Sequence, residues 1–413
     1  MTIFLHFLRS APLHFGKKYD ILKKQIRKQT RGIIRKKQSK SAILRFSLLV
    51  TAFLLVLSAL LVLQRYIPEE PLPPDGSTDV TDVLSDPSSG ASDKTDLPAT
   101  STDTGTGSDV STDVTPPPPT YDVDTEVLRQ LAQPLFASTK YAAKHVVVMD
   151  LTTGTILFEK DSDAKITAAS TVKLLTALTM LDYVNEDTLF TVGSELSLVG
   201  KNSSTAGLKK GYTLTVEQIL DALLIPSGND AAYVIAAHVG RILGRDPQIK
   251  DKDAVALFLE KMNDKARSLG AEASDFTCPD GYPNKTQFTT ASDMSKIGQA
   301  AAESPEILRT VEKVYVKHKL QSGQTVEFTT TNKLLLPSSS FYYEGTFGFK
   351  TGYTGAAGQC FLGGANAYGH KILVAVYNAS TSDGRWKDCR TAFDTAAKAI
   401  KQAQDAYKEG ATQ

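Results

Sequence analysis

The longest apolar run in the chain, FSLLVTAFLLVLSALLVL, covers Phe46 to Leu63 without a charged residue. As a helix, these 18 residues would extend for about 27 Å, close to the roughly 30 Å hydrocarbon core of a bilayer. Arg45 and Arg65 close the run on its two sides. A helix buried in a protein core usually keeps a polar face, so the pattern predicts a single membrane-spanning helix.

Beyond residue 140, short strand patterns and helical patterns alternate. The β-branched segments HVVVMD and TILFEK, separated by a turn at Leu151–Gly154, predict a hairpin. Helical spacing dominates the middle of the chain, and short strand candidates return after Gly345. We therefore expect an α/β (α+β) body, in which an antiparallel sheet formed from both ends is flanked by helices and interrupted by a mostly helical insertion.

Local end signals support several of the helices. Thr215 begins a capping box with Gln218, and Ser304 is an N-cap before Pro305. The expected helices cover 170–183, 218–225, 230–239, 253–269 and 391–406, and the expected late strands cover 347–353, 359–364 and 371–378.

Composition describes an ordinary globular protein, with 413 residues, 41% of them hydrophobic, and a formal net charge of +1. The charge is, however, unevenly distributed. Residues 1–45 carry 13 Lys or Arg and one acid, residues 64–124 carry two basic and 13 acidic residues, and residues 125–413 carry 31 of each sign. We therefore divide the chain into a basic arm (1–45), a transmembrane anchor (46–63), an acidic linker (64–124) and a neutral body (125–413).

The charge pattern also predicts the topology. A basic flank usually stays in the cytoplasm, which places the body outside the cell membrane. No small-x-small cleavage site follows the apolar run, which favours an uncleaved signal anchor over a removed signal peptide. The linker is rich in Ser, Thr, Asp and Pro, and it is expected to be a disordered tether. The basic arm lacks aromatic interleaving, so we expect it to contact anionic lipid and not nucleic acid.

Three short motifs carry the candidate chemistry. The first, S-T-V-K, opens an apolar helix with Ser170 and Lys173. A spacing of three places both side chains on one helix face, so a neutral Lys173 amine can take the proton of the Ser170 hydroxyl. Burial against the neighbouring leucines would lower the lysine pKa, as that role requires.

The other two motifs supply hydrogen-bonding groups and a cation. The second, S-G-N, presents Ser227 and Asn229 in a loop between two apolar helices. The third, K-T-G, places Lys350 and Thr351 on a strand, where an ammonium and a hydroxyl can meet a carboxylate. Gly352 leaves room there for the backbone to approach a substrate.

The three motifs in this order resemble those of the serine D-alanyl-D-alanine carboxypeptidases, the low-molecular-mass penicillin-binding proteins. The resemblance covers about residues 125–405 and implies a β-lactamase/transpeptidase-like fold. The further stretches that carry it are VVVMDLTTGTILFEKDSDAKITAAS, LKKGYTLTVEQILDALLIPSGNDAA, DGYPNKTQFTTASDM, TNKLL and KTGYTGAAGQC.

The resemblance implies a reaction and a role for each catalytic residue. A peptidoglycan stem peptide would acylate Ser170 with release of its terminal D-alanine, and water would then hydrolyse the acyl-enzyme. Lys173 would be the base, and Ser227 would relay a proton toward the leaving group. β-Lactams would be covalent inhibitors.

It also implies how the substrate is held. Asn229 would bind the substrate amide, and Lys350 with Thr351 would bind the terminal carboxylate. Backbone N–H groups of Ser170 and Tyr353 would hold the oxyanion.

Two other functions share some of these features. A serine β-lactamase has the same three motifs, but the E-x-x-x-N segment of one large class does not occur between Ser227 and Lys350. A non-catalytic wall-binding or β-lactam-sensing module is the second alternative, and the intact motif residues argue against it.

The remaining chemistry-bearing residues give weaker signals. The six histidines show no metal-binding spacing and no G-x-S-x-G elbow is present, so no metal or cofactor is expected. Cys278, Cys360 and Cys389 allow at most one intramolecular disulfide, with the pairing left open.

Overall fold

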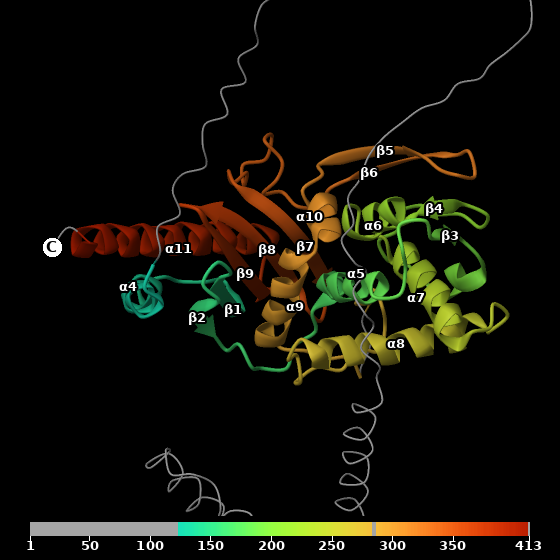
Figure 1. Ribbon diagram of the computed structural model, residues 1–413, viewed down its shortest axis with the longest axis horizontal. Coiled ribbons are helices and arrows are strands. Elements are labelled where there is room, and N and C mark those ends of the chain that lie inside the picture. Colours follow the sequence, from blue (N-terminus) through green and yellow to red (C-terminus); the bar gives the residue numbers. More distant parts are fainter. Residues whose placement is uncertain (1–122, 283–285, 412–413) are drawn as a thin grey trace, which may run out of the picture. The chain divides into compact units, whose positions relative to one another are not determined.

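The computed structural model describes residues 123–282 and 286–411 (Figure 1). The basic arm, the predicted transmembrane anchor and almost all of the acidic linker lie outside these residues, so those three assignments stay predictions. Within the described part of the chain, no helix combines the length and the apolar character needed to cross a membrane.

A five-stranded antiparallel sheet forms the centre of the body (Figure 1). Its strands follow the order β2-β1-β9-β8-β7. Their bounds are β1 Ala143–Asp150, β2 Thr155–Lys160, β7 Thr346–Thr354, β8 Gly358–Ala367 and β9 His370–Ala379. Because β1 pairs with β9, strands from both ends of the body share one sheet, and this part of the sequence prediction is confirmed.

Alternation along the strands gives the sheet two buried faces. Val146 and Val148 of β1 pack in one apolar cluster with Trp386, together with helices α4 (Thr125–Ala137) and α11 (Ser382–Ala411). The intervening Val147 and Met149 point to the other cluster, which contains the helical insertion. The sheet is therefore a middle layer between two sets of helices.

The insertion between β2 and β7 is mostly helical, as predicted. It contains the 3₁₀ turns η1 (Ala169–Val172) and η2 (Ser194–Leu198), and helices α5 (Lys173–Leu181), α6 (Val216–Leu224), α7 (Asn229–Gly244), α8 (Asp251–Ser268), α9 (Ala291–Glu303) and α10 (Pro305–Val311). The capping box at the start of α6 is present, with both reciprocal hydrogen bonds between Thr215 and Gln218. The Ser304 hydroxyl accepts from the Ile307 N–H at the start of α10.

Several elements differ from the sequence expectation. The helix expected from residue 170 begins as the turn η1 and becomes α-helical only at Lys173. Helix α11 begins at Ser382, ahead of the expected residue 391. Two small ribbons and the first helix α4 were not predicted. The ribbons are β3–β4 (Leu189–Thr191 with Thr213–Thr215) and β5–β6 (Tyr315–Lys319 with Thr325–Thr329).

Candidate active site

Ser170 and Lys173 meet at the start of α5. The Lys173 side chain is fully buried, and its Nζ lies 2.9 Å from the Ser170 Oγ. The same Nζ donates to the Asn229 Oδ1 at 2.7 Å and to the Asp280 backbone oxygen at 2.8 Å. An amide oxygen and a carbonyl oxygen can only accept hydrogen bonds. If Lys173 loses a proton, its lone pair can therefore face only the Ser170 hydroxyl.

Burial brings the titration of Lys173 close to neutral pH. Desolvation lowers the pKa of Lys173 to about 8, although the negative charges of Asp280 and Asp230 oppose the shift. A useful fraction of the amine is then neutral near pH 8, and a neutral amine can accept a proton from Ser170.

The turn that holds Ser170 is fixed by two glycines from distant segments. Ala169 has a φ of 48°, a conformation uncommon for a residue with a Cβ. A Cβ at Gly281 would overlap the Ala169 carbonyl oxygen, and one at Gly352 would lie 3.0 Å from the Ala168 oxygen. Three chain segments thus pack closely around the serine. The close approach of strand β7 to the serine turn explains why the third position of K-T-G is a glycine.

The second motif lies beside Lys173. Ser227 has a φ of 70° and occupies the loop between α6 and α7, and its hydroxyl has no hydrogen-bond partner among the described residues. Asn229 is the first residue of α7. Its side-chain oxygen is engaged by Lys173, whereas its NH₂ group has no partner in the described part of the chain. A hydroxyl and an amide N–H are therefore available to a substrate.

The third motif divides between the cavity wall and the interior. Lys350 is fully buried, and its Nζ donates to the Thr351 backbone oxygen at 3.1 Å. Burial, and then the positive charges of Lys173 and Arg385, hold the pKa of Lys350 well below its usual range. Lys350 thus lies behind the wall, and direct contact of Lys350 with a carboxylate stays a prediction.

A cavity of about 620 Å³ brings the motifs together. Six of the eight predicted site residues line it, namely Ser170, Ser227, Asn229, Thr351, Gly352 and Tyr353. Its other walls are Asn202, Ser203, Ser204, Gly281, Tyr282, Thr331, Thr354, Gly355, Gln359 and Arg385. The lining is rich in hydroxyl and amide groups, so a polar, peptide-like ligand fits it chemically.

Arg385 is a site residue that the sequence reasoning missed. It lies near the start of α11, is 7% exposed and lines the cavity. Its Nη1 donates to the backbone oxygens of Gly352 at 3.2 Å and Cys360 at 3.1 Å, and its guanidinium stacks over the Trp386 ring. It belongs to no motif, and only the tertiary structure brings it to strand β7.

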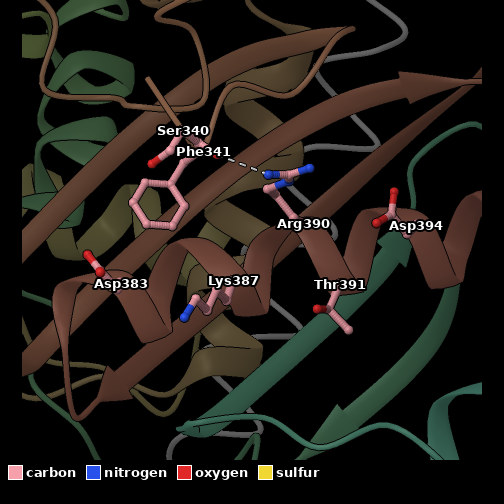
Figure 2. A pocket seen from close by; sticks show the side chains of 7 residues that line it. All are labelled: Ser340, Phe341, Asp383, Lys387, Arg390, Thr391 and Asp394. Atoms are coloured by element: carbon pink, nitrogen blue, oxygen red, sulfur yellow. Dashed lines mark hydrogen bonds between the residues drawn. The ribbon is translucent and has the colours of Figure 1, made fainter. Parts of the chain in front are cut away.

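Figure 2 shows a second hollow, of about 510 Å³, on the outer side of α11. Its lining residues are Ser340, Phe341, Asp383, Lys387, Arg390, Thr391 and Asp394. The Arg390 guanidinium donates to the Ser340 backbone oxygen at 3.1 Å across this hollow. No residue of the three motifs lines it, so the candidate active site is the first cavity.

The three cysteines are free and buried. Burial raises the pKa of Cys278 to about 12 and that of Cys360 to about 11, and it raises the pKa of Cys389 as well. Such thiols are poor nucleophiles at neutral pH. Among residues 123–282 and 286–411, no cluster of three or more His, Cys, Asp or Glu side chains could hold a metal ion.

Comparison with known proteins gives consistent matches. A family model described as D-alanyl-D-alanine carboxypeptidase matches residues 131–381. The D-alanyl-D-alanine carboxypeptidase DacB2 of Mycobacterium tuberculosis is 31% identical over 253 residues, which cover 60% of this chain and 80% of that protein. The D-alanyl-D-alanine carboxypeptidase of Streptomyces sp. strain K15 is 33% identical over 267 residues, covering 61% of this chain and 86% of that protein.

Comparison with solved structures indicates the same family. The crystal structure of the Streptomyces K15 DD-transpeptidase matches with a TM-score of 0.57 and 29% identity, covering 62% of this chain and 98% of that one. Penicillin-binding protein D2 of Listeria monocytogenes, solved in its ampicillin-bound form, shares the fold with a TM-score of 0.51 and 24% identity, covering 63% of this chain and 98% of that one.

Proposed function

Because the chain belongs to the D-alanyl-D-alanine carboxypeptidase family of serine peptidases, we propose that Ser170 is its nucleophile and Lys173 the base that activates it. The activity itself, that of a serine-type D-Ala-D-Ala carboxypeptidase among the low-molecular-mass penicillin-binding proteins, follows from the family match and the named relatives. The observation that carries the residue assignment is the 2.9 Å contact between the Ser170 Oγ and a fully buried Lys173 amine.

In the proposed acylation, the Ser170 Oγ attacks the carbonyl carbon between the two terminal D-alanines of a peptidoglycan stem peptide. Its proton passes to the neutral Lys173 amine. Backbone N–H groups of Ser170 and Tyr353 stabilise the oxyanion. The C–N bond then breaks as the Lys173 ammonium returns its proton, through the Ser227 hydroxyl, to the departing amine, so that D-alanine leaves, an ester on Ser170 remains and Lys173 is neutral again.

Deacylation uses the same groups in reverse. A water molecule attacks the ester carbonyl and gives its proton to the Lys173 amine. Collapse of the second tetrahedral intermediate breaks the ester bond and returns the proton to the Ser170 oxygen. The shortened peptide leaves, and the enzyme regains its starting protonation state.

In the same proposal, the terminal carboxylate of the substrate binds at the strand β7 end of the cavity. The Thr351 hydroxyl and the Arg385 guanidinium both line the cavity there. A charge-assisted hydrogen bond to a carboxylate is roughly twice as strong as a neutral one. The buried Lys350 lies directly behind this wall and supports it through its hydrogen bond to the Thr351 oxygen.

Covalent labelling tests the nucleophile. We expect a fluorescent penicillin to label the full chain and not the Ser170→Ala variant. Ser203→Ala is the matched control, since Ser203 lines the same cavity outside the motifs and should keep its labelling. Labelling that persists in Ser170→Ala would remove Ser170 from the mechanism.

Product analysis separates the proposed activity from the two alternatives. Steady D-alanine release from a diacyl-D-Ala-D-Ala peptide supports the carboxypeptidase. Rapid turnover of penicillin with little peptide cleavage indicates a β-lactamase. Stable penicillin labelling without D-alanine release indicates a sensing or wall-binding module.

We also propose that residues 46–63 anchor the enzyme in the cell membrane with the body outside. The proposal rests on the charge-free run and on the basic and acidic segments that flank it. The full chain should stay with membranes after an alkaline carbonate wash, and a variant lacking 46–63 should be released. Intact cells should expose the body, but not the basic arm, to an added protease.

A further inference from the structure

Thr331 connects two parts of the active site that come from distant segments. It follows the β5–β6 ribbon and lines the catalytic cavity. Its Oγ1 lies 2.7 Å from the Oγ1 of Thr351 in the K-T-G motif. Its backbone N–H donates to the Ile225 oxygen at 3.2 Å, two residues before Ser227. One residue therefore contacts both the carboxylate-binding strand and the loop of the second motif.

The hydroxyl pair can be arranged in two ways. Each hydroxyl has one proton, and either Thr331 or Thr351 can be the donor of their shared hydrogen bond. If Thr351 donates to Thr331, its proton is unavailable to a ligand. If Thr331 donates to Thr351, the Thr351 proton is free to point into the cavity.

A bound carboxylate selects between these arrangements. A carboxylate can only accept hydrogen bonds, so it favours the state in which Thr351 donates to it and Thr331 donates to Thr351. The second hydrogen bond polarises the first, and chains of this kind are mutually strengthening. Thr351 is buried, and Thr331 is its side chain's sole hydrogen-bond partner among residues 123–282 and 286–411.

We propose that Thr331 is a positioning residue for substrate recognition. It orients the Thr351 hydroxyl as a donor and so raises the affinity for peptides that end in a free carboxylate. The inference rests on the proposed function, in which Thr351 binds that carboxylate. Through its N–H bond to Ile225, Thr331 also sets the position of this binding group relative to the Ser227 loop.

Substitution of the hydroxyl alone tests the idea. Thr331→Val keeps the shape and the backbone N–H but removes the hydroxyl, whereas Thr331→Ser keeps the hydroxyl. The matched control is Thr329→Val, because Thr329 is exposed at the end of β6 and its hydroxyl has no hydrogen-bond partner in the described residues. Each full-length variant is assayed for D-alanine release from a diacyl-D-Ala-D-Ala peptide.

We expect Thr331→Val to raise KM about tenfold with kcat changed less than twofold, which is near the upper end of the effect of losing one hydrogen bond between neutral groups. Thr331→Ser and Thr329→Val should stay within about threefold of wild type. As a second readout, the same peptide with a C-terminal carboxamide is used as a competitive inhibitor, and its inhibition constant should change less than twofold in Thr331→Val.

Other results would overturn the inference. An unchanged KM in Thr331→Val would show that Thr351 needs no partner. Equal losses for the carboxylate and the carboxamide, or a fall in kcat with an unchanged KM, would show a purely structural role. The proposed function fails separately, because in that case the wild-type chain itself releases no D-alanine or Ser170→Ala retains activity.

Discussion

Two lysines removed from water define the chemistry of this site. Lys173 and Lys350 are both fully buried, and burial lowers the pKa of each. Three acceptors surround the Lys173 ammonium, and two of them cannot donate in return. The resting ammonium is thus well satisfied, while loss of one proton would leave a lone pair directed at the Ser170 Oγ.

This arrangement predicts the pH dependence. The base is active when neutral, so kcat/KM should fall about tenfold for each pH unit below the Lys173 pKa of about 8 and should level off above it. Acylation rates with a peptide and with a penicillin, measured from pH 6 to 10, should both show this rise with pH and level off at the same pH. A rate that is independent of pH between 6 and 9 would contradict the assignment.

A second prediction concerns the glycine of K-T-G. In Gly352→Ala the new Cβ would lie 3.0 Å from the Ala168 oxygen and 3.2 Å from the Ser170 nitrogen, so the serine turn must shift. The shift required is a few tenths of an ångström. Since misplacement by about 1 Å can cost 10²-fold in rate, we expect acylation to fall by about tenfold.

The control for this variant is Gly355→Ala, which lines the same cavity but has open space around its Cβ position. It should acylate within about threefold of wild type. Penicillin acylation rates and thermal melting of both variants measure the effect. Similar rates for the two variants would show that the serine turn tolerates displacement.

Residues differ in how far the sequence reveals them. Ser170 and Lys173 are recognisable because their spacing has a local meaning. Arg385 is not, since its position depends on helix α11 packing against strands β8 and β9, from where its guanidinium reaches the Gly352 oxygen of β7, and nothing near it in the sequence indicates this. The full burial of Lys350 is equally hidden, because neighbours that remove a lysine from water come from other elements.

At the scale of elements, capping residues correctly predicted where helices begin. Where contacts between distant segments determine the backbone, the sequence prediction was less accurate. The capping residues Thr215 and Ser304 begin α6 and α10 as expected. By contrast, the chain at Ser170 is held in a 3₁₀ turn by glycines from two distant segments, so helical spacing placed that helix start too early. The β5–β6 ribbon is half exposed and lacks a continuous apolar face, and it was missed.

The capping box gives a prediction at this scale. Thr215→Ala removes the hydroxyl that accepts from the Gln218 N–H, and it should lower the free energy of unfolding by about 1 kcal/mol. For a body of this size, the melting temperature should fall by about 2 °C. Thr215→Ser should restore most of the loss, and D-alanine release should be unaffected by either change. A melting temperature equal to wild type in Thr215→Ala would mean that the cap is replaced by water.

At the scale of the whole molecule, the uneven distribution of charge along the chain predicts a membrane topology from the sequence alone. The bonding state of the cysteines, by contrast, could be described only from the structure. Cys278, Cys360 and Cys389 are buried in separate surroundings and remain free thiols. Cysteine counting set only an upper limit of one disulfide. Cys360 and Cys389 lie in the two apolar clusters, whereas the Cys278 Sγ donates to the Gln287 Oε1 at 3.2 Å. The sequence does not reveal these surroundings, in which all three remain small buried side chains.

These thiols predict how the enzyme reacts with reagents. The native protein should react with no equivalent of a disulfide-exchange reagent over minutes, and the denatured protein with three, since the pKa of each thiol is raised by burial. A reducing agent should leave the melting temperature unchanged. Fast reaction of one native thiol, or a melting temperature that falls on reduction, would contradict this prediction.

The pairing of β1 with β9 also bears on how each molecule matures. Ala143 lies opposite Ala379 in the sheet. The first strand of the body therefore cannot pair with the last one until the last one has been synthesised. Contacts so far apart in sequence slow folding, because a long loop must close before any pairing is gained. Strand β7, which packs against the serine turn, joins β1 only through β8 and β9. A nascent or truncated chain that ends before β9 should therefore be catalytically silent, and activity begins only when synthesis of the protein is nearly complete.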